Sequence, residues 1–246
     1  MDNRVYVAMS GAKETLRAQT ANFHNLANAS TTGFRADLSA FQSQAVQGAG
    51  LPTRIYATDS SLGWDPTQGQ LEQTGRELDV AVKGAGWIAV QGPDGREAYT
   101  RAGDLHVDEN GQLLTATGQA VMTDSGPLAV PPHSAISIAR DGSVSIVPMG
   151  QTPNTVAVVG RIKLVNPPAA QLDRGNDGLF RMRNGTDAPS DAGVQLADGA
   201  LEASNVNVAE AMTQMIELAR RFDLQVKSIK TAEDDAQAAA RLLQGA

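Results

Sequence analysis

The chain has 246 residues, of which 41% are hydrophobic and only 4% aromatic, and it contains 24 glycines and 11 prolines. So many turn-forming residues indicate a β-rich body, and the length suffices for one large core or two modest ones. The net charge of −7 makes nucleic acid and anionic membranes poor partners. The absence of cysteine excludes disulfides, thiol catalysis and thiolate metal sites.

The sequence predicts neither a membrane span nor a secretory signal. No run of 18 or more apolar residues occurs, and the opening residues MDNRVY lead into no apolar stretch. If the protein leaves the cytoplasm, we therefore expect a different export route to carry it.

Residues 1–34 are predicted to form an N-terminal helix. Their apolar or small residues recur at alternating steps of four and three, with one polar interruption at Gln19, which is heptad spacing. Asp2 or Asn3 can cap the start, and stop signals follow from Asn28 to Gly33. We expect this stripe to be an assembly interface formed by Val5, Met9, Ala12, Leu16, Phe23 and Leu26.

Residues 35–71 are polar, rich in Gly and Gln, and without a sustained period, so we expect an extended connector there. From residue 72 to residue 198 the hydrophobic period switches to two, and turn signals separate many short runs, which predicts an antiparallel β body. One of these signals, Asp141-Gly142, suits a type I′ hairpin turn between Ile136 and Ile146.

Residues 199–246 are predicted to carry the second helix. Asn207 followed by Glu210 is an Asn version of the capping box, which places an acid at the positive helix end. Rows with seven-residue spacing then run along the helix, as in a seam that faces another helix. The expected interface residues are Val208, Met212, Met215, Ala219, Phe222, Val226, Ile229 and Leu243.

The predicted fold class is therefore α+β, with an antiparallel β-rich body inserted between two heptad, coiled-coil-like helices. Isolated helices with a single apolar stripe are marginally stable. We therefore expect both terminal helices of the free chain to be disordered, or to pair only with a neighbouring molecule.

Two stretches resemble ligand-binding motifs superficially. Gly84-Ala85-Gly86 with Ala89 loosely matches a dinucleotide fingerprint, but a strand-like run follows where the fingerprint needs a helix. His106–Gly111 shows three spacings of a calcium loop, but Thr117 stands where a bidentate Glu is needed. We interpret both as turns.

No catalytic or metal-binding set is expected. The histidines His24, His106 and His133 are far apart and form no short ligand pair. No G-x-S-x-G elbow occurs. An acid-pair hydrolase that acts on the cell wall remains a remote alternative, because carboxylates are plentiful.

Four stretches of sequence resemble the signatures of the flagellar rod and hook axial proteins, and they occur in the order found in that family. They are NLANASTTGFR (25–35), TGRELDVAVKGAG (74–86), YTRAG with its continuation (99–118) and GALEASNVN (199–207). Two departures are Trp87-Ile88, where two aromatics are common, and Val208, where proline is common. Together the signatures cover both ends and the first half of the body.

The resemblance implies a structural subunit of the flagellar basal-body rod that polymerises through its terminal helices, without catalysis or cofactors. Members that form the proximal rod are the most similar, and a distal-rod subunit is the alternative. The implied partners are copies of the chain, other rod subunits and the flagellar type III export apparatus. The implied location is the rod where it crosses the periplasm, reached without a cleaved signal.

Overall fold

The computed structural model describes residues 3–45, 55–151 and 155–244, and the chain divides into two compact units. The helical unit joins Met1–Ala29, Ala36–Asp65 and Val206–Ala246, and the β body joins Ser30–Arg35 and Pro66–Asn205. The α+β class with mainly antiparallel strands is confirmed. Coiled-coil winding of the helices stays a prediction.

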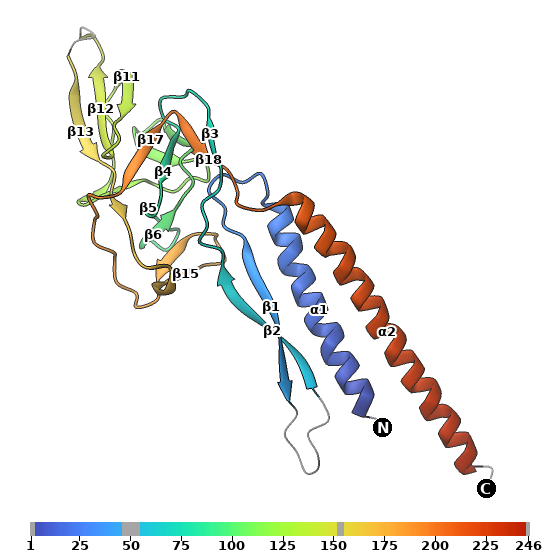
Figure 1. The fold of residues 1–246 in the computed structure, drawn as a ribbon. Helices are drawn as coiled ribbons and strands as arrows, with labels where there is room; N and C mark the ends of the chain where they lie inside the picture. Colours follow the sequence, from blue (N-terminus) through green and yellow to red (C-terminus); the bar gives the residue numbers. More distant parts are fainter. Residues whose placement is uncertain (1–2, 46–54, 152–154, 245–246) are drawn as a thin grey trace. The chain divides into compact units, whose positions relative to one another are not determined.

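Two helices dominate the helical unit, α1 (Asn3–Ala27) and α2 (Val208–Gln244). They lie side by side and antiparallel (Figure 1). The predicted cap of α2 is confirmed, because the Asn207 side-chain oxygen accepts hydrogen bonds from the backbone N–H groups of Ala209 and Glu210 at 3.1 and 3.2 Å. The expectation that each helix pairs only with a neighbouring molecule is wrong for this structure, since each helix packs on the other.

The segment that we expected to be an extended connector holds a long β-hairpin of β1 (Asp37–Ala45) and β2 (Ile55–Trp64). The hairpin belongs to the helical unit and packs against α1. Its strands are rich in Ser, Thr, Gln and Ala, so they lack the apolar alternation that identified the strands of the body. Backbone pairing does not require that alternation, which explains why the sequence pattern missed them.

The β body contains the remaining strands, most of them in antiparallel pairs. A five-stranded sheet has the order β14-β5-β6-β16-β15 and a three-stranded sheet the order β11-β12-β13, while the other strands form two-stranded sheets. The bounds of the body's first eight strands are β3 (Leu71–Gln73), β4 (Val80–Lys83), β5 (Trp87–Gln91), β6 (Glu97–Thr100), β7 (Leu105–Val107), β8 (Leu113–Thr115), β9 (Met122–Thr123) and β10 (Gly126–Pro127). The others are β11 (His133–Ile138), β12 (Ser143–Pro148), β13 (Ala157–Arg161), β14 (Leu164–Val165), β15 (Leu172–Arg174), β16 (Phe180–Met182), β17 (Gln195–Asp198) and β18 (Ala200–Glu202), with a 3-10 turn at Ala169–Gln171.

One apolar core lies inside the body, and it is built from the alternating residues that predicted the strands. Val80, Val82, Ile88 and Val90 are fully buried, and they pack with the inward residues of β11 and β12. Trp87 contacts Phe180, with ring centroids 4.5 Å apart. The core therefore fixes the sheets around the two strands that follow the TGR motif.

The turn between β11 and β12 differs from the predicted type I′ turn. That type needs positive φ at both central residues, and none of the described residues other than glycine has a positive φ. Instead, the Gly142 N–H donates to the Ala139 carbonyl at 2.9 Å, and only Gly142, with φ of 86°, adopts the left-handed conformation. This is a type I turn followed by a glycine bulge, a longer connection in which Asp141 keeps an ordinary backbone.

The face of α1 that meets α2 is made of small and polar residues. Ala8, Gly11, Thr15, Ala18 and Asn22 are buried and recur at steps of three and four. The Asn22 side chain donates to the Ala211 carbonyl of α2 at 2.7 Å. On α2, among the residues whose side chains are described, the buried positions are Ala211, Leu218 and Ala232. We call these residues the inner seam.

Substitutions at Gly11 test the packing of the inner seam. A Cβ atom at Gly11 would lie 2.6 Å from the mobile end of Gln225, which can move aside. Gly11→Ala should therefore leave the helical unit as stable or stabilise it by up to about 1 kcal/mol, because glycine is a poor helix former. Gly11→Leu should destabilise it by about 1–3 kcal/mol through overpacking.

The measurement is the thermal loss of helical circular dichroism. If both variants melt alike, the inner seam does not hold the helices together.

Candidate functional site

The outer faces of the two helices carry large apolar side chains that stay exposed. On α1, Met9 is 54% exposed and Leu16 and Phe23 are each 47% exposed. On α2, Met212 is 52% and Val226 is 46% exposed. We call this set the outer stripe; its members are Met9, Leu16, Phe23, Val208, Met212, Ala219 and Val226.

The structure splits the predicted interface between two environments. Seven of its thirteen described residues form the outer stripe, and the other six are partly buried at the border of the inner seam: Val5, Ala12, Leu26, Met215, Phe222 and Ile229. The side chain of Leu243 lies outside the described residues. The predicted stripe is thus turned about the helix axis from the surface that the two helices bury against each other.

A polar tie joins the end of α1 to the start of the hairpin. The Asp37 backbone N–H donates to the Asn25 side-chain oxygen at 2.7 Å, and the Asn25 amide donates to the Asp37 carbonyl at 3.0 Å. The Asp37 carboxylate lies 2.7 Å from His24 Nδ1. Asn25 is the first residue of the NLAN signature. Only an amide side chain can both accept from the Asp37 N–H and donate to the Asp37 carbonyl, which explains why asparagine stands here.

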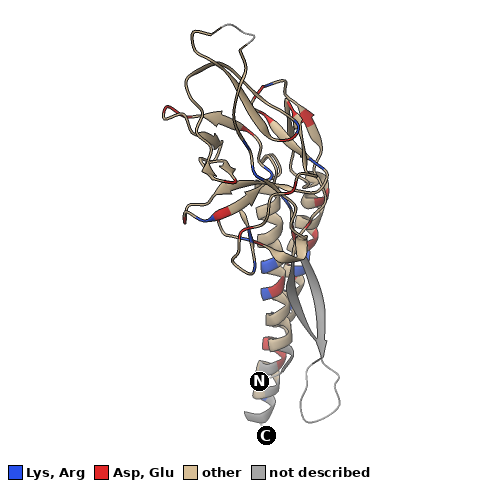
Figure 2. Cartoon of the chain, turned by 90° about the vertical axis from the view of Figure 1, so that its left-hand side faces the viewer, with Lys and Arg blue, Asp and Glu red and all other residues tan. Residues whose placement is uncertain are grey.

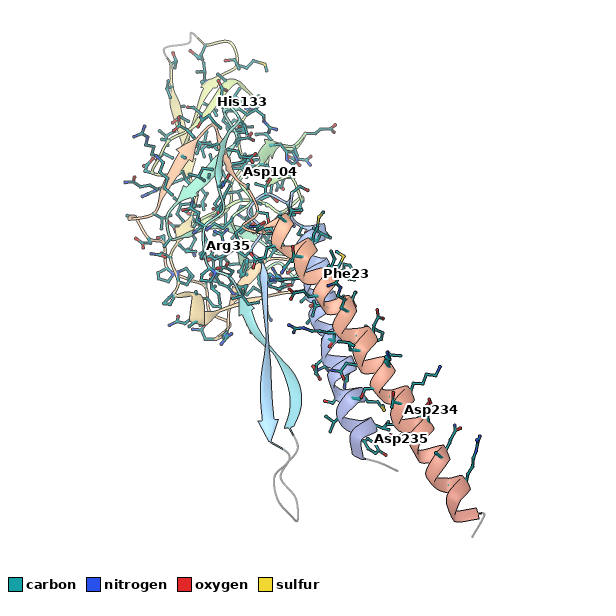
Figure 3. All side chains as sticks on the ribbon, turned by 45° about the vertical axis from the view of Figure 1, so that its right-hand side comes forward. Phe23, Arg35, Asp104, His133, Asp234 and Asp235 are labelled. Atoms are coloured by element: carbon teal, nitrogen blue, oxygen red, sulfur yellow. The ribbon has the colours of Figure 1, made fainter. Side chains whose placement is uncertain are left out.

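A buried ionic cluster closes the β body at the segments where the chain enters and leaves it. Glu202 is fully buried; one of its oxygens lies 2.5 Å from Arg35 Nη1 and the other lies 2.9 Å from Arg101 Nη1. Arg101 also donates to the Gly84 carbonyl at 2.6 Å and stacks over Trp87. Burial lowers the pKa of Arg101 and the Arg35 charge adds to this, whereas Glu202 opposes it. Figure 3 shows Arg35 among the side chains of the body.

Two signature glycines allow the surrounding backbones to approach. A Cβ atom at Gly33 would lie 2.3 Å from the Arg101 carbonyl carbon, and the residue has a φ of 68°. A Cβ at Gly103 would lie 1.7 Å from the Val80 carbonyl oxygen. No side chain fits at either position, and the four signature stretches therefore meet around Glu202.

Comparison with known proteins finds matches among flagellar rod and hook proteins. A family model described as the C-terminal part of the flagellar basal-body rod FlgEFG proteins matches residues 197–242. A model described as the D1 domain of the flagellar hook proteins FlgE/F/G matches residues 81–146. The flagellar basal-body rod protein FlgF of Escherichia coli K12 is 46% identical, with 99% of each chain covered.

The chain belongs to the flagellar basal-body rod protein family. The rod protein FlgF of Salmonella typhimurium LT2 is 45% identical, also over 99% of both chains. The rod protein FlgG of Buchnera aphidicola from Acyrthosiphon pisum is 34% identical over 90% of this chain and 94% of its own. The sequence resemblance to rod proteins, and within them to FlgF, is confirmed.

The stretches that resembled ligand sites are turns in the structure. Strand β5 follows Gly86 directly, so no helix N-terminus stands where a pyrophosphate would need one. The Asp108 carboxylate accepts hydrogen bonds from the N–H groups of Asn110 and Gln112, which lowers its pKa. Within the described ranges, no three His, Cys, Asp or Glu side chains are grouped to hold a metal, and no helix is long and apolar enough to cross a membrane.

The ionic cluster is a feature that sequence reasoning missed. Its members Arg35, Arg101 and Glu202 belong to three separate signatures. A usable signal was present, since each is a charged residue inside a stretch of small or apolar residues. Pairing them still requires the fold, because Arg35 and Glu202 come from opposite ends of the chain.

A second buried acidic contact involves Asp79 of the TGR motif and Asp104. The two residues form a β-bridge, and the Asp79 carboxylate also contacts Arg76 at 3.4 Å and accepts from the Thr74 hydroxyl at 2.6 Å. Burial raises the pKa of Asp104, and the Asp79 charge raises it further, whereas Arg76 and His106 oppose the shift.

Neutralising Asp104 should stabilise the body at neutral pH. A carboxyl group with a raised folded-state pKa contributes its stability below its ordinary pKa of about 4 and loses it as pH rises through the folded value. Asp104→Asn should therefore melt at a higher temperature than the unsubstituted chain at pH 7, and this advantage should vanish near pH 3. Thermal melts of both chains between pH 3 and pH 7 test this prediction. If the two melting temperatures differ equally at both pH values, the charge is not the cause.

Removing the Glu202 charge should destabilise the body strongly. Glu202→Gln leaves two buried guanidinium groups without a counter-charge, and breaking a buried pair in this way typically costs about 3–5 kcal/mol. Urea denaturation measures the loss. Glu72→Gln, an exposed acid on β3, is the matched control and should change stability by less than about 0.5 kcal/mol.

Proposed function

We propose that the chain is a structural subunit of the proximal flagellar rod and polymerises through the outer stripe of its helical unit. One observation carries this proposal. The two helices already pack on each other along the inner seam, while the seven apolar or small residues of the outer stripe stay exposed. Fully burying one large apolar side chain stabilises a protein by about 1.5–3 kcal/mol. Burying the exposed half of such a side chain against a neighbouring subunit would therefore stabilise the assembly by roughly half of that.

Open-ended assembly suits this arrangement. A neighbour that covers the outer stripe with a different surface of its own makes a heterologous contact rather than a two-fold one. Heterologous contacts that do not close generate helical filaments, which is the geometry of a rod. Torque would pass through repeated helix contacts, and such a role needs no catalytic group.

The proximal position is supported by the comparison of identities. FlgF proteins reach 46% identity over nearly the whole chain, whereas the FlgG proteins that also match reach 34% over nine tenths of it. A distal-rod subunit of the FlgG type is the second candidate. Electron microscopy of basal bodies from a deletion strain separates the two, because loss of a proximal subunit should truncate the rod before its distal part.

The proposed partners are copies of this chain, other rod subunits and the flagellar type III export apparatus. We expect passage through that apparatus to occur without cleavage of a signal. Mass spectrometry of the subunit recovered from basal bodies tests this, since the chain should retain its encoded N-terminal sequence.

A charge on the outer stripe should block assembly without harming the free chain. Val226→Asp places a carboxylate at a position that is half-exposed in the monomer but buried in the assembly that we propose, where it would lack a partner. We expect loss of swimming and loss of the subunit from isolated basal bodies, with the thermal melt of the purified chain changed by less than about 0.5 kcal/mol.

Thr231→Asp introduces the same charge at an exposed position of α2 outside the outer stripe and should be tolerated. Normal motility with Val226→Asp would contradict assembly through this surface.

A further inference from the structure

The longer helix α2 projects past the start of α1. The contact of Gln225 with Gly11 places the two residues at the same level of the antiparallel pair. Asn3, where α1 begins, lies eight residues further along and therefore faces about residue 233 of α2. Figure 1 shows the same difference in reach.

Residues 233–244 of α2 form this overhang, which is roughly 18 Å long at the helical rise. Ala232 is the last buried residue on α2 among those whose side chains are described. The overhang therefore lies beyond the surface that α1 covers.

The charges on α2 are segregated into blocks. The overhang begins with three consecutive acids, Glu233, Asp234 and Asp235, all exposed. Figure 3 shows Asp234 and Asp235 on the lower part of α2. Just before them lies a basic band, residues 220–230, whose two arginines, two lysines and one aspartate give a net charge of +3. Figure 2 colours the acidic residues red and the basic residues blue.

The acidic block makes no ion pair with the part of the chain that the structure describes. Among the described residues, none of the three acids has an ion-pair partner within 4 Å. Lys230 precedes Asp234 by four residues, which is the less favourable order for a pair within one helix. With respect to the described residues, the block is therefore available to a partner outside the chain.

We propose that the overhang of one subunit docks beside the basic band of a second copy. This inference rests on the proposed polymerisation and adds how far two neighbouring copies are shifted along the helix axis. Two copies packed in register would place like charges together, which is repulsive. A shift of about seven to fourteen residues, roughly 10–21 Å, sets the acids of one copy beside the bases of the next and covers the overhang.

Charge reversal tests the docking in a deletion strain complemented with variants of the full chain. Asp234→Lys with Asp235→Lys should stop swimming when it is the sole copy, and so should Lys227→Glu with Lys230→Glu. All four changes in one chain should restore swimming to at least half the normal rate, because the complementarity returns with opposite sign. Co-expression of the two double variants should also restore it, since each overhang then meets an opposite charge on the other variant.

The matched control is Glu109→Lys with Asp124→Lys, which makes the same change of charge at exposed positions of the body and should swim normally. The double variants should melt like the unsubstituted chain, since all four sites are exposed.

Cross-linking gives a second measurement that does not depend on charge. The chain has no cysteine, so Ser228→Cys in one copy and Gln237→Cys in another introduce the only thiols. A thiol cross-linker added to basal bodies that contain both variants should yield dimers, and either variant alone should yield at least fivefold fewer.

Normal swimming of both double variants overturns the docking, as does absence of the mixed dimer. Failure of both variants without rescue, either in one chain or by co-expression, also overturns it and identifies a different rod protein as the partner. In each case Met212→Asp, which changes the outer stripe at an exposed position outside the basic band, decides whether the outer stripe mediates assembly, so the two proposals fail separately.

Discussion

Glu202 is buried between two guanidinium groups, and the closure of the β body depends on that contact. A carboxylate can be moved out of water only when charged partners and hydrogen bonds replace its hydration. Here those partners come from the segment that follows α1 and from the end of β6, so satisfying one charge draws together the entry and the exit of the body. The glycines at 33 and 103 serve the same closure, because any side chain at either position would collide with backbone.

The helical unit follows a different principle, in which two faces of each helix have different tasks. Small residues along the inner seam let the backbones approach, and side chains such as Asn22 satisfy polar groups across it. The larger apolar residues are directed outward, where they add little to the free chain. A rod subunit has to be soluble before assembly and firmly held afterwards, and this division of residues serves both requirements.

The charge blocks of α2 and the unequal lengths of the two helices also differentiate the helical unit along its axis. The outer stripe supplies attraction without a strong preference for position, because apolar contacts are not directional. Alternating blocks of charge and an unequal length of the two helices can supply that preference, as in-register packing is repulsive and an offset is attractive. Screening at physiological salt limits each exposed pair to about 0.2–1 kcal/mol, so the offset needs several pairs that act together.

Local sequence patterns were sufficient for both helices, for many strands of the body and for the family. Heptad spacing identified both helices, Asn207 identified the cap of α2, and two-residue alternation identified strands such as β4 and β5. These features depend on neighbours within a few residues. The polar hairpin of β1 and β2 was missed for the same reason, since its pairing does not rely on an apolar pattern.

Only the tertiary structure decided which face of each helix is buried and which charges meet. Ala8, Gly11 and Ala18 carry little hydrophobic signal, yet their small size makes their face the one along which the helices pack. The partnership of Arg35 with Glu202 joins residues from opposite ends of the chain, so no local pattern could reveal it. Close packing and burial of charge depend on what the rest of the chain brings near, and that is settled only when the fold is complete.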